Sequence, residues 1–298
     1  MSGTAHTFGG SWTEQKLSLL DQYLSAYTTA LKNQPFILGY IDAFAGTGTR
    51  TAHQPTDAQQ AALLDFPAEE AAEFFDGSVR IALRTDPPFQ HFVFIESDRR
   101  RYAALDETLK SEFPEIYNSG KVQILKQDAN TAIQNLLKTS SPDYRAVMFL
   151  DPYGMQVSWK TIEGIAASRI IDLLVLFPIG MGVNRLLRKD GRIRESEKRR
   201  LTDCFGSADW ESKFYKQSDQ RSLFSPEDEA VKTANFETIA NHYNDRLKSV
   251  FEAVATNPVW LRNSKNSPLY ALCFAASNAK GAPIAVRIAT HIFKKASG

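Results

Sequence analysis

Pro35-Phe-Ile-Leu-Gly-Tyr-Ile-Asp42-Ala-Phe-Ala-Gly46-Thr-Gly48 is the segment from which the architecture of this chain can be worked out. An apolar run that ends in an acid and a glycine turn is typical of a buried parallel strand whose C-terminal end opens into a loop. A further apolar run covers Ile171–Pro178, and three others end in acids, at Glu96, Asp128 and Asp151. Helical patterns separate the runs, so residues 36–178 predict an α/β fold with a doubly wound parallel sheet.

The second half of the chain changes in character. Residues 181–250 have a polar, helical pattern, which predicts a helical basic insertion between two parts of one α/β domain, 1–180 and 251–298. Within the last part, the apolar runs Ala253–Leu261 and Leu269–Ala276 are joined by a short polar loop. Two such runs predict an antiparallel strand pair that closes the sheet.

Composition excludes several classes of protein. The 298 residues are 43% hydrophobic and 23% charged with a net charge of +1, so any nucleic-acid surface must be local. The two cysteines, Cys204 and Cys273, lie far apart and the histidines show no ligand spacing, which argues against a metal site or disulfide scaffold. The longest apolar run is too short to span a membrane and no signal peptide is visible, so we expect a soluble cytoplasmic protein.

The loop after the first strand carries the strongest local signal. Its G-x-G pattern lacks the third glycine of the dinucleotide fingerprint, and the absence of the Lys of a P-loop excludes that motif. A simple structural turn is the alternative to a binding loop. Glycine N–H groups suit a carboxylate and Asp42 suits an ammonium. S-adenosylmethionine carries both groups, and we expect Asp42, Phe44, Gly46 and Gly48 to bind it.

Two further strand ends complete the predicted cofactor site. Glu96 can accept hydrogen bonds from both ribose hydroxyls, although a polar, alanine-rich insertion (50–76) then separates it from the glycine loop. Asp128 can accept the adenine amino group. Both residues have an alternative role as helix caps, and Asp98 competes with Glu96 for the ribose.

The fourth strand end, Asp151-Pro152-Tyr153-Gly154, predicts the acceptor site. The lone pair of an exocyclic amine is delocalised into its ring, and acceptors for the amine protons localise it. The Asp151 carboxylate and the Pro152 carbonyl supply such acceptors, while the Tyr153 ring can stack on a flipped base. A simple strand-ending turn is the alternative.

These motifs together resemble class I S-adenosylmethionine-dependent methyltransferases. The segments Trp12–Lys16, Phe177–Leu187 and Asn266–Phe274 further resemble the three-Cys-motif partner proteins, along nearly the whole chain. This resemblance implies a Rossmann-like methyltransferase fold, a cysteine-motif protein as partner and, in some members, a winged-helix-like segment. Asp151–Gly154 also resembles a motif of tRNA guanine 2-amino methyltransferases, which implies an exocyclic amine as acceptor.

The insertion opens with a basic run, in which residues 185–200 hold eight Lys and Arg against three Asp and Glu. Phosphate contacts supply the sequence-independent part of nucleic-acid affinity, so the run predicts a nucleic-acid surface, with RNA ahead of DNA. A solvated helix face is the alternative. The sequence therefore predicts methyl transfer to a nucleobase amine. Two alternative functions remain: a cofactor-binding adaptor without transfer, and a small-molecule methyltransferase. The cations assigned to this surface are Arg185, Arg188, Lys189 and Arg192.

Overall fold

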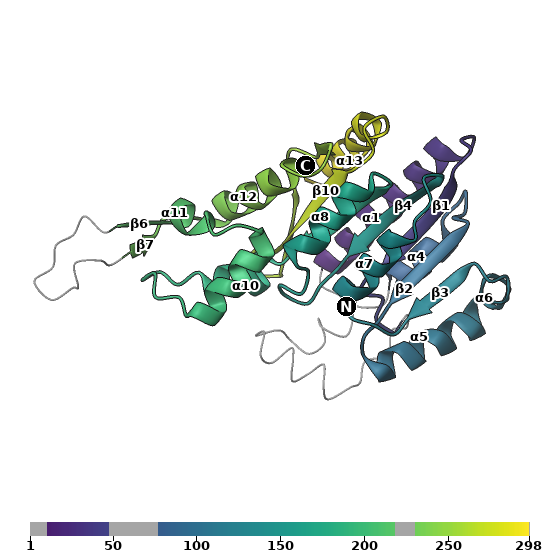
Figure 1. The fold of residues 1–298 in the computed structure, drawn as a ribbon, viewed down its shortest axis with the longest axis horizontal. Coiled ribbons are helices and arrows are strands. Elements are labelled where there is room, and N and C mark those ends of the chain that lie inside the picture. Colours follow the sequence, from purple (N-terminus) through teal and green to yellow (C-terminus); the bar gives the residue numbers. More distant parts are fainter. Residues whose placement is uncertain (1–10, 48–76, 218–229, 298) are drawn as a thin grey trace, which may run out of the picture.

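The computed structural model describes residues 11–47, 77–217 and 230–297, and an eight-stranded sheet forms the centre of the described chain (Figure 1). Across the sheet the order is β3-β2-β1-β4-β5-β10-β8, and β9 pairs with β10 off this path. The strands are β1 (Ile37–Asp42), β2 (His91–Ile95), β3 (Val122–Leu125), β4 (Tyr144–Leu150), β5 (Ile171–Phe177), β8 (Ala253–Val254), β9 (Val259–Arg262) and β10 (Pro268–Ala276).

Strand direction and order define the fold class. Strands β3, β2, β1, β4 and β5 pair in parallel, whereas β10 runs antiparallel to β5, β8 and β9. The chain proceeds from β1 outward to β3 and then returns to build β4 and β5 on the other side, so the order reverses between β1 and β4. The predicted doubly wound, Rossmann-like sheet is confirmed, and in such sheets ligands bind outside the carboxyl ends of the strands at the reversal.

Helices cover both faces of the sheet, which gives three layers. Alternate residues of each strand point to opposite faces, so Tyr40 and Phe149 pack in one core while Ile41 and Met148 pack in the other. One face carries α1 (Ser11–Leu31), α4 (Ser78–Arg84), α5 (Arg99–Glu112) and α13 (Ala282–Ser297). The other face carries α7 (Ala129–Lys138), α8 (Trp159–Ser168), α10 (Glu195–Phe205), α11 (Trp210–Phe214) and α12 (Phe236–Lys248). Shorter elements are α6 (Pro114–Asn118), the π-helix η2 (Ile179–Val183) and α9 (Asn184–Leu186).

The region predicted as a helical insertion extends away from the sheet in Figure 1 and contains α10, α11, α12 and a small antiparallel sheet of β6 (Tyr215–Gln217) and β7 (Ala230–Lys232). Its helices share a core with the central sheet, because the rings of Phe177 and Tyr243 stack at 4.0 Å and 10°. The division into 1–180 plus 251–298 and 181–250 therefore separates two parts of one packed body, and its winged-helix-like character stays a prediction.

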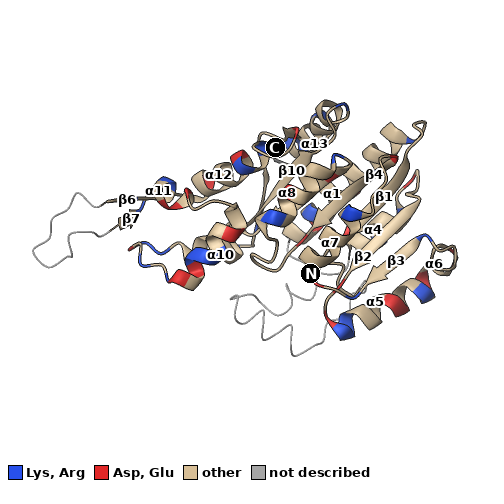
Figure 2. Cartoon of the chain, in the orientation of Figure 1, with Lys and Arg blue, Asp and Glu red and all other residues tan. Residues whose placement is uncertain are grey.

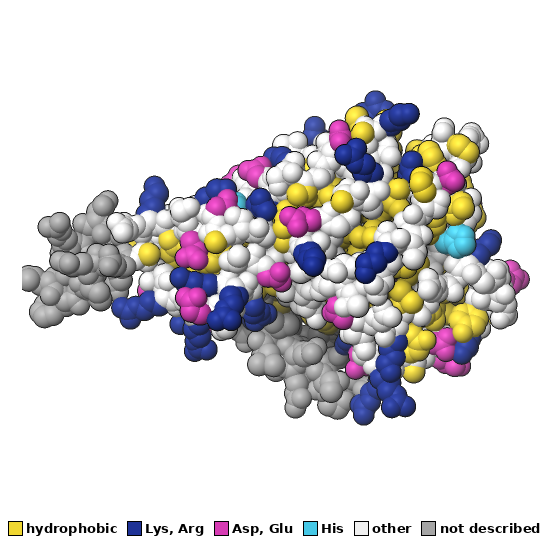
Figure 3. Space-filling model, in the orientation of Figure 1, with side chains coloured by type: hydrophobic (Ala, Val, Ile, Leu, Met, Phe, Trp, Pro, Cys, Tyr) yellow, Lys and Arg dark blue, Asp and Glu magenta, His cyan; other side chains and the backbone are white. Residues whose placement is uncertain are grey.

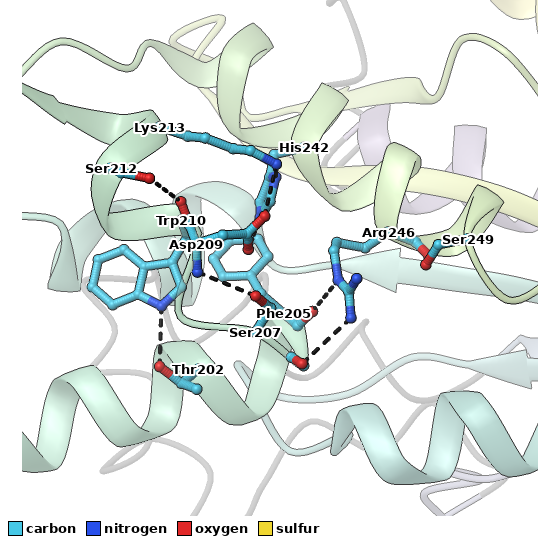
Figure 4. Close-up of polar contacts among 11 residues, drawn as sticks. Thr202, Phe205, Ser207, Asp209, Trp210, Ser212, Lys213, His242, Arg246 and Ser249 are labelled. Carbon is cyan, nitrogen blue, oxygen red and sulfur yellow. Dashed lines mark hydrogen bonds and ion pairs between the residues drawn. The ribbon is translucent and has the colours of Figure 1, made fainter.

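Polar contacts link α10 to α11 and α12 within this extension (Figure 4). The Arg246 guanidinium donates from Nε to the Phe205 carbonyl at 2.8 Å and from Nη2 to the Gly206 carbonyl at 3.3 Å. The Trp210 indole N–H donates to the Thr202 hydroxyl at 3.1 Å. The two Arg246 bonds satisfy backbone carbonyls at the end of α10.

One predicted element is wrong in its extent. The run Ala253–Leu261 was expected as a single strand, but it forms two short strands, β8 and β9, which both pair with β10. Pro258 lies between them and has no N–H for a ladder hydrogen bond, so the strand breaks there.

Candidate functional site

Asp42 is the last residue of β1 and lies at the reversal of the strand order, fully buried. Its Oδ1 accepts a hydrogen bond from the Phe44 N–H at 3.1 Å, and its Oδ2 accepts one from the Tyr40 hydroxyl at 3.3 Å. Burial raises the pKa of the Asp42 carboxyl to about 6, although a hydrogen bond from Ser78 and the Phe44 N–H oppose the shift. When it is ionised, the Asp42 carboxyl group can bind a cationic group of a ligand.

The chain bends sharply after Asp42. Gly46 has a φ of +64°, a left-handed conformation that glycine adopts without steric cost. The Ala45 N–H donates to the Ile95 carbonyl at 3.0 Å, so the bend is tied to the end of β2. Phe44 is half-buried and packs against the core that contains Ile41 and Met148. The predicted glycine loop thus exists as far as residue 47; Gly48 and the insertion 50–76 lie outside the described residues.

Glu96 follows β2 directly and is buried at the same edge of the sheet as Asp42. Its Oε1 accepts the Asp98 N–H at 2.7 Å and the Arg101 Nη2 at 3.1 Å. Asp98, the other acid considered for the ribose, caps α5 by accepting the N–H groups of Arg100 and Arg101. Glu96 is therefore not the helix cap, and its position suits a hydroxyl-bearing ligand.

Asp128 occupies a different setting. It is exposed after β3 and caps α7, where its Oδ1 accepts the Thr131 N–H at 3.0 Å. The alternative role considered from the sequence, a helix cap, is thus present in the structure. Asp128 follows β3, which lies next to the β2 strand of Glu96 and two strands from the β1 strand of Asp42.

Asp151 follows β4 and forms a buried ion pair with Lys16 of α1, whose Nζ lies 2.7 Å from Asp151 Oδ2. Lys16 itself is 1% exposed and its ammonium lies 5.5 Å from the centre of the Trp12 ring. Burial raises the pKa of Asp151, while the charge and hydrogen bond of Lys16 oppose the shift. Among the described residues, no group hydrogen-bonds the buried Oδ1 of Asp151.

Pro152 and Tyr153 directly follow Asp151 in the segment after β4. Pro152 is buried, and Tyr153 is half-buried against the core that contains Tyr40 and Phe149. The Tyr153 N–H donates to the Gln156 side chain at 2.8 Å, which fixes the turn. The assignment of Asp151, Pro152 and Tyr153 to the acceptor site stays a prediction.

Sequence reasoning missed Lys16. The apolar stripe of α1 includes Leu20, Leu24 and Tyr27, and Lys16 lies four residues before Leu20 on the same face. A lysine at a buried position of an otherwise apolar stripe needs an acidic partner. That pattern was the available signal, whereas the identity of its partner depends on packing between residues 135 apart.

The predicted basic surface lies on α9 and on the loop that precedes α10. Figure 2 shows Lys and Arg on α10 and that loop, and Figure 3 shows them along the lower edge of the extension with Asp and Glu between them. Arg188 forms a 3.5 Å ion pair with Glu197, and the Arg188 carbonyl accepts the Tyr215 hydroxyl at 2.9 Å. The four predicted cations are exposed: Arg185, Arg188, Lys189 and Arg192.

Within residues 11–47, 77–217 and 230–297, no group of three or more His, Cys, Asp or Glu is arranged to hold a metal ion. None of the helices in these ranges combines the length and the apolar character needed to cross a membrane.

Comparison with known proteins gives solved structures only; no family model and no curated protein matches the chain. A Legionella pneumophila protein of the family DUF519 has a TM-score of 0.49 and 11% identity, covering 98% of this chain and 94% of that one. Trm1 from Pyrococcus horikoshii, solved with S-adenosyl-L-methionine, has a TM-score of 0.43 and 11% identity, covering 89% and 56%. An S-adenosylmethionine-dependent methyltransferase from Clostridium acetobutylicum has a TM-score of 0.38 and 9% identity, covering 87% and 92%. The fold class stated above rests on the strand order and directions of this chain.

Proposed function

We propose that this protein is an S-adenosylmethionine-dependent methyltransferase that acts on an exocyclic amine of a nucleobase, in RNA ahead of DNA. The observation that carries the proposal is the edge of the sheet at the reversal between β1 and β4. There a left-handed glycine bend and the buried acids Asp42, Glu96 and Asp151 follow neighbouring strands.

The cofactor fits this edge by its chemistry. Asp42 suits the ammonium of the methionine tail, N–H groups of the bend at Gly46 suit its carboxylate, and Glu96 suits the ribose hydroxyls. Phe44 and Gly48 belong to the same loop in sequence, and Asp128 is proposed for the adenine amino group beside its capping role. When bound, the cofactor supplies an electrophilic methyl group on a sulfonium.

Transfer requires positioning more than acid–base chemistry. The amine nitrogen forms a bond to the methyl carbon while the carbon–sulfur bond breaks and its electron pair returns to sulfur. The nitrogen becomes cationic and then loses a proton to solvent. Asp151 Oδ1 and the Pro152 carbonyl are proposed to accept the amine hydrogens, and Tyr153 to stack on the base. The exposed cations of the extension would hold the phosphates.

A second candidate function is a cofactor-binding adaptor without transfer, acting beside a three-Cys-motif protein. The ion pair between Asp151 and Lys16 favours it, because one oxygen of the proposed acceptor carboxylate already has a buried partner. This adaptor role and membership of the three-Cys-motif partner family rest on the sequence resemblance.

Two measurements test the candidates. Calorimetry with S-adenosylmethionine and with its demethylated product tests the cofactor site. If neither compound binds, both candidate functions are refuted. Incubation with labelled methyl donor and total RNA, DNA or protein then tests transfer. The methyltransferase proposal expects label in RNA, lost in Asp151→Ala while cofactor affinity stays within about threefold. Cofactor binding without label in any pool would favour the adaptor.

A further inference from the structure

The Asp151–Lys16 pair joins two distant parts of the chain at the proposed acceptor site. Lys16 belongs to α1 on one face of the sheet, whereas Asp151 follows β4, and their side chains are 1% and 7% exposed. Removing two charges from water is costly, and such a pair gives little net stability compared with apolar side chains of similar volume. A function for the pair is therefore worth seeking.

The two oxygens of Asp151 differ. Oδ2 lies 2.7 Å from the Lys16 ammonium, while Oδ1 is buried and accepts no hydrogen bond from any described group. An unpartnered carboxylate oxygen in a buried setting retains its capacity to accept a proton donor. The ion pair also fixes the carboxylate in one orientation, so that Oδ1 is the oxygen left for a ligand.

The surroundings of Asp151 would favour its neutral form without Lys16. The titratable groups that act on this region are Lys16 from α1, Asp42 and Tyr40 from β1, Tyr270 from β10 and Tyr153 of the same turn. Lys16 is the cation among them, and the others are acids or phenols. A protonated Asp151 could not accept an amine hydrogen as strongly as the carboxylate does.

On the basis of the proposed function, we propose that Lys16 is a positioning residue of the acceptor site. It keeps Asp151 ionised and directs Oδ1 toward the amine of the substrate. Lys16 does not touch the substrate, and it acts through the carboxylate that does.

The test is the pH dependence of methyl transfer into RNA between pH 5 and 9. In Lys16→Met we expect the acid limb of the profile to move up by at least about one pH unit, because an adjacent cation lowers a carboxyl pKa by about 1–3 units. At pH values well below the midpoint of the wild-type limb, a shift of one pH unit makes transfer about tenfold slower than in the wild type, with recovery to within about threefold at pH 8.5. Lys16→Arg keeps a cation and should follow the wild-type profile.

Lys32→Met is the matched control, because Lys32 is exposed just beyond the end of α1. Its profile should equal that of the wild type. A purely structural role for Lys16 would lower the melting temperature of Lys16→Met without moving the acid limb, and that outcome would overturn the proposal.

A direct titration separates this proposal from the proposed function. The carboxyl pKa of Asp151, read by carbon NMR and assigned with Asp151→Asn, should rise in Lys16→Met even if the wild type transfers no methyl group. An unchanged pKa overturns the role of Lys16, whereas absent transfer with a shifted pKa refutes only the methyltransferase. If Lys16→Met does not fold, Lys16→Gln replaces the ammonium with a neutral side chain that can still hydrogen-bond Asp151. Its acid limb should also move up, and a wild-type limb in it would overturn the proposal.

Discussion

The three aspartates that are buried among the described residues differ in what surrounds them. Asp42 accepts hydrogen bonds from an amide and hydroxyls, Asp151 has an ammonium partner, and Asp172 of β5 accepts the Tyr23 hydroxyl at 2.8 Å. Burial raises the pKa of Asp42 to about 6 and that of Asp172 to about 7, while hydrogen bonds from Ser78 and Tyr23, respectively, oppose these shifts. Burial also raises the pKa of Asp151, and the Lys16 ammonium opposes that shift.

The raised pKa of Asp172 makes a prediction for stability. Between about pH 4 and pH 7 the unfolded chain releases this proton while the folded chain keeps it, so stability falls as pH rises through this range. The contribution is up to about 1.4 kcal/mol per pH unit. Asp172→Asn should remove it, so that urea unfolding at pH 5, 6 and 7 shows a smaller loss than in the wild type. Asp143→Asn, an exposed control just before β4, should keep the wild-type slope; equal slopes in all three proteins would contradict the pKa shift.

Glu96 gives a prediction for cofactor affinity. Glu96→Gln removes the charge that strengthens hydrogen bonds to ribose hydroxyls, so the Kd for S-adenosylmethionine should rise about tenfold, equivalent to about 1.4 kcal/mol. Titration calorimetry measures it, and a melting curve checks that loss of the Arg101 pair leaves the fold intact. The control is Glu107→Gln on the exposed side of α5. If both variants bind as the wild type does, Glu96 does not hold the ribose.

At the scale of elements, the junction of α10 with α8 depends on one glycine. Gly206 ends α10 with a φ of +70°, and a Cβ there would lie 1.9 Å from the Trp159 ring. The residue thus combines a left-handed conformation with close approach to an indole. Arg246 adds to this junction, since its guanidinium lies 4.7 Å from the centre of the same ring.

Gly206→Ala should therefore destabilise the protein by more than the backbone term alone. A left-handed alanine costs about 1–2 kcal/mol, and the clash with Trp159 adds to it. Gly120→Ala is the matched control, because Gly120 has a φ of +73° and nothing within 4 Å of its Cβ position. The difference between the two variants in urea unfolding measures the clash. Equal losses would show that the indole moves aside without cost.

Helix ends illustrate what sequence signals can and cannot distinguish. An acid after a strand can bind a ligand or cap the next helix, and the sequence left both roles open for Glu96 and Asp128. In the structure Asp98 caps α5 and Asp128 caps α7, which leaves Glu96 buried beside Arg101. The spacing of one or two residues decides which carboxylate reaches the helix N–H groups.

At the scale of the whole molecule, the extension beyond the sheet carries the predicted nucleic-acid surface. Because the chain as a whole has a net charge of only +1, attraction to phosphates has to come from a local group of cations. The exposed residues Arg185 and Lys189 belong to the start of this surface.

Removing two of these cations should weaken RNA binding in a salt-dependent way. For Arg185→Gln/Lys189→Gln we expect the magnitude of the slope of log K against log salt to fall by roughly 1.4–1.8, since each phosphate contact contributes about 0.7–0.9. Fluorescence anisotropy with a labelled RNA between 50 and 300 mM salt measures it. Lys121→Gln/Lys138→Gln removes the same charge from exposed positions before β3 and at the end of α7. The prediction fails if the two double variants give the same slope.

The sequence by itself predicted a doubly wound sheet for residues 36–178, the glycine bend after Asp42 and the placement of acids at strand ends, whereas the order of the strands came from the structure. These features depend on residue patterns a few positions long, and short-range sterics and hydrophobic alternation fix them. Only the tertiary structure decided that Lys16 faces Asp151, that Pro258 splits the C-terminal strand and that the extension shares the core of the sheet through Tyr243. The reason is physical: these outcomes depend on packing between segments far apart in the chain, where burial, and not local preference, selects the partner.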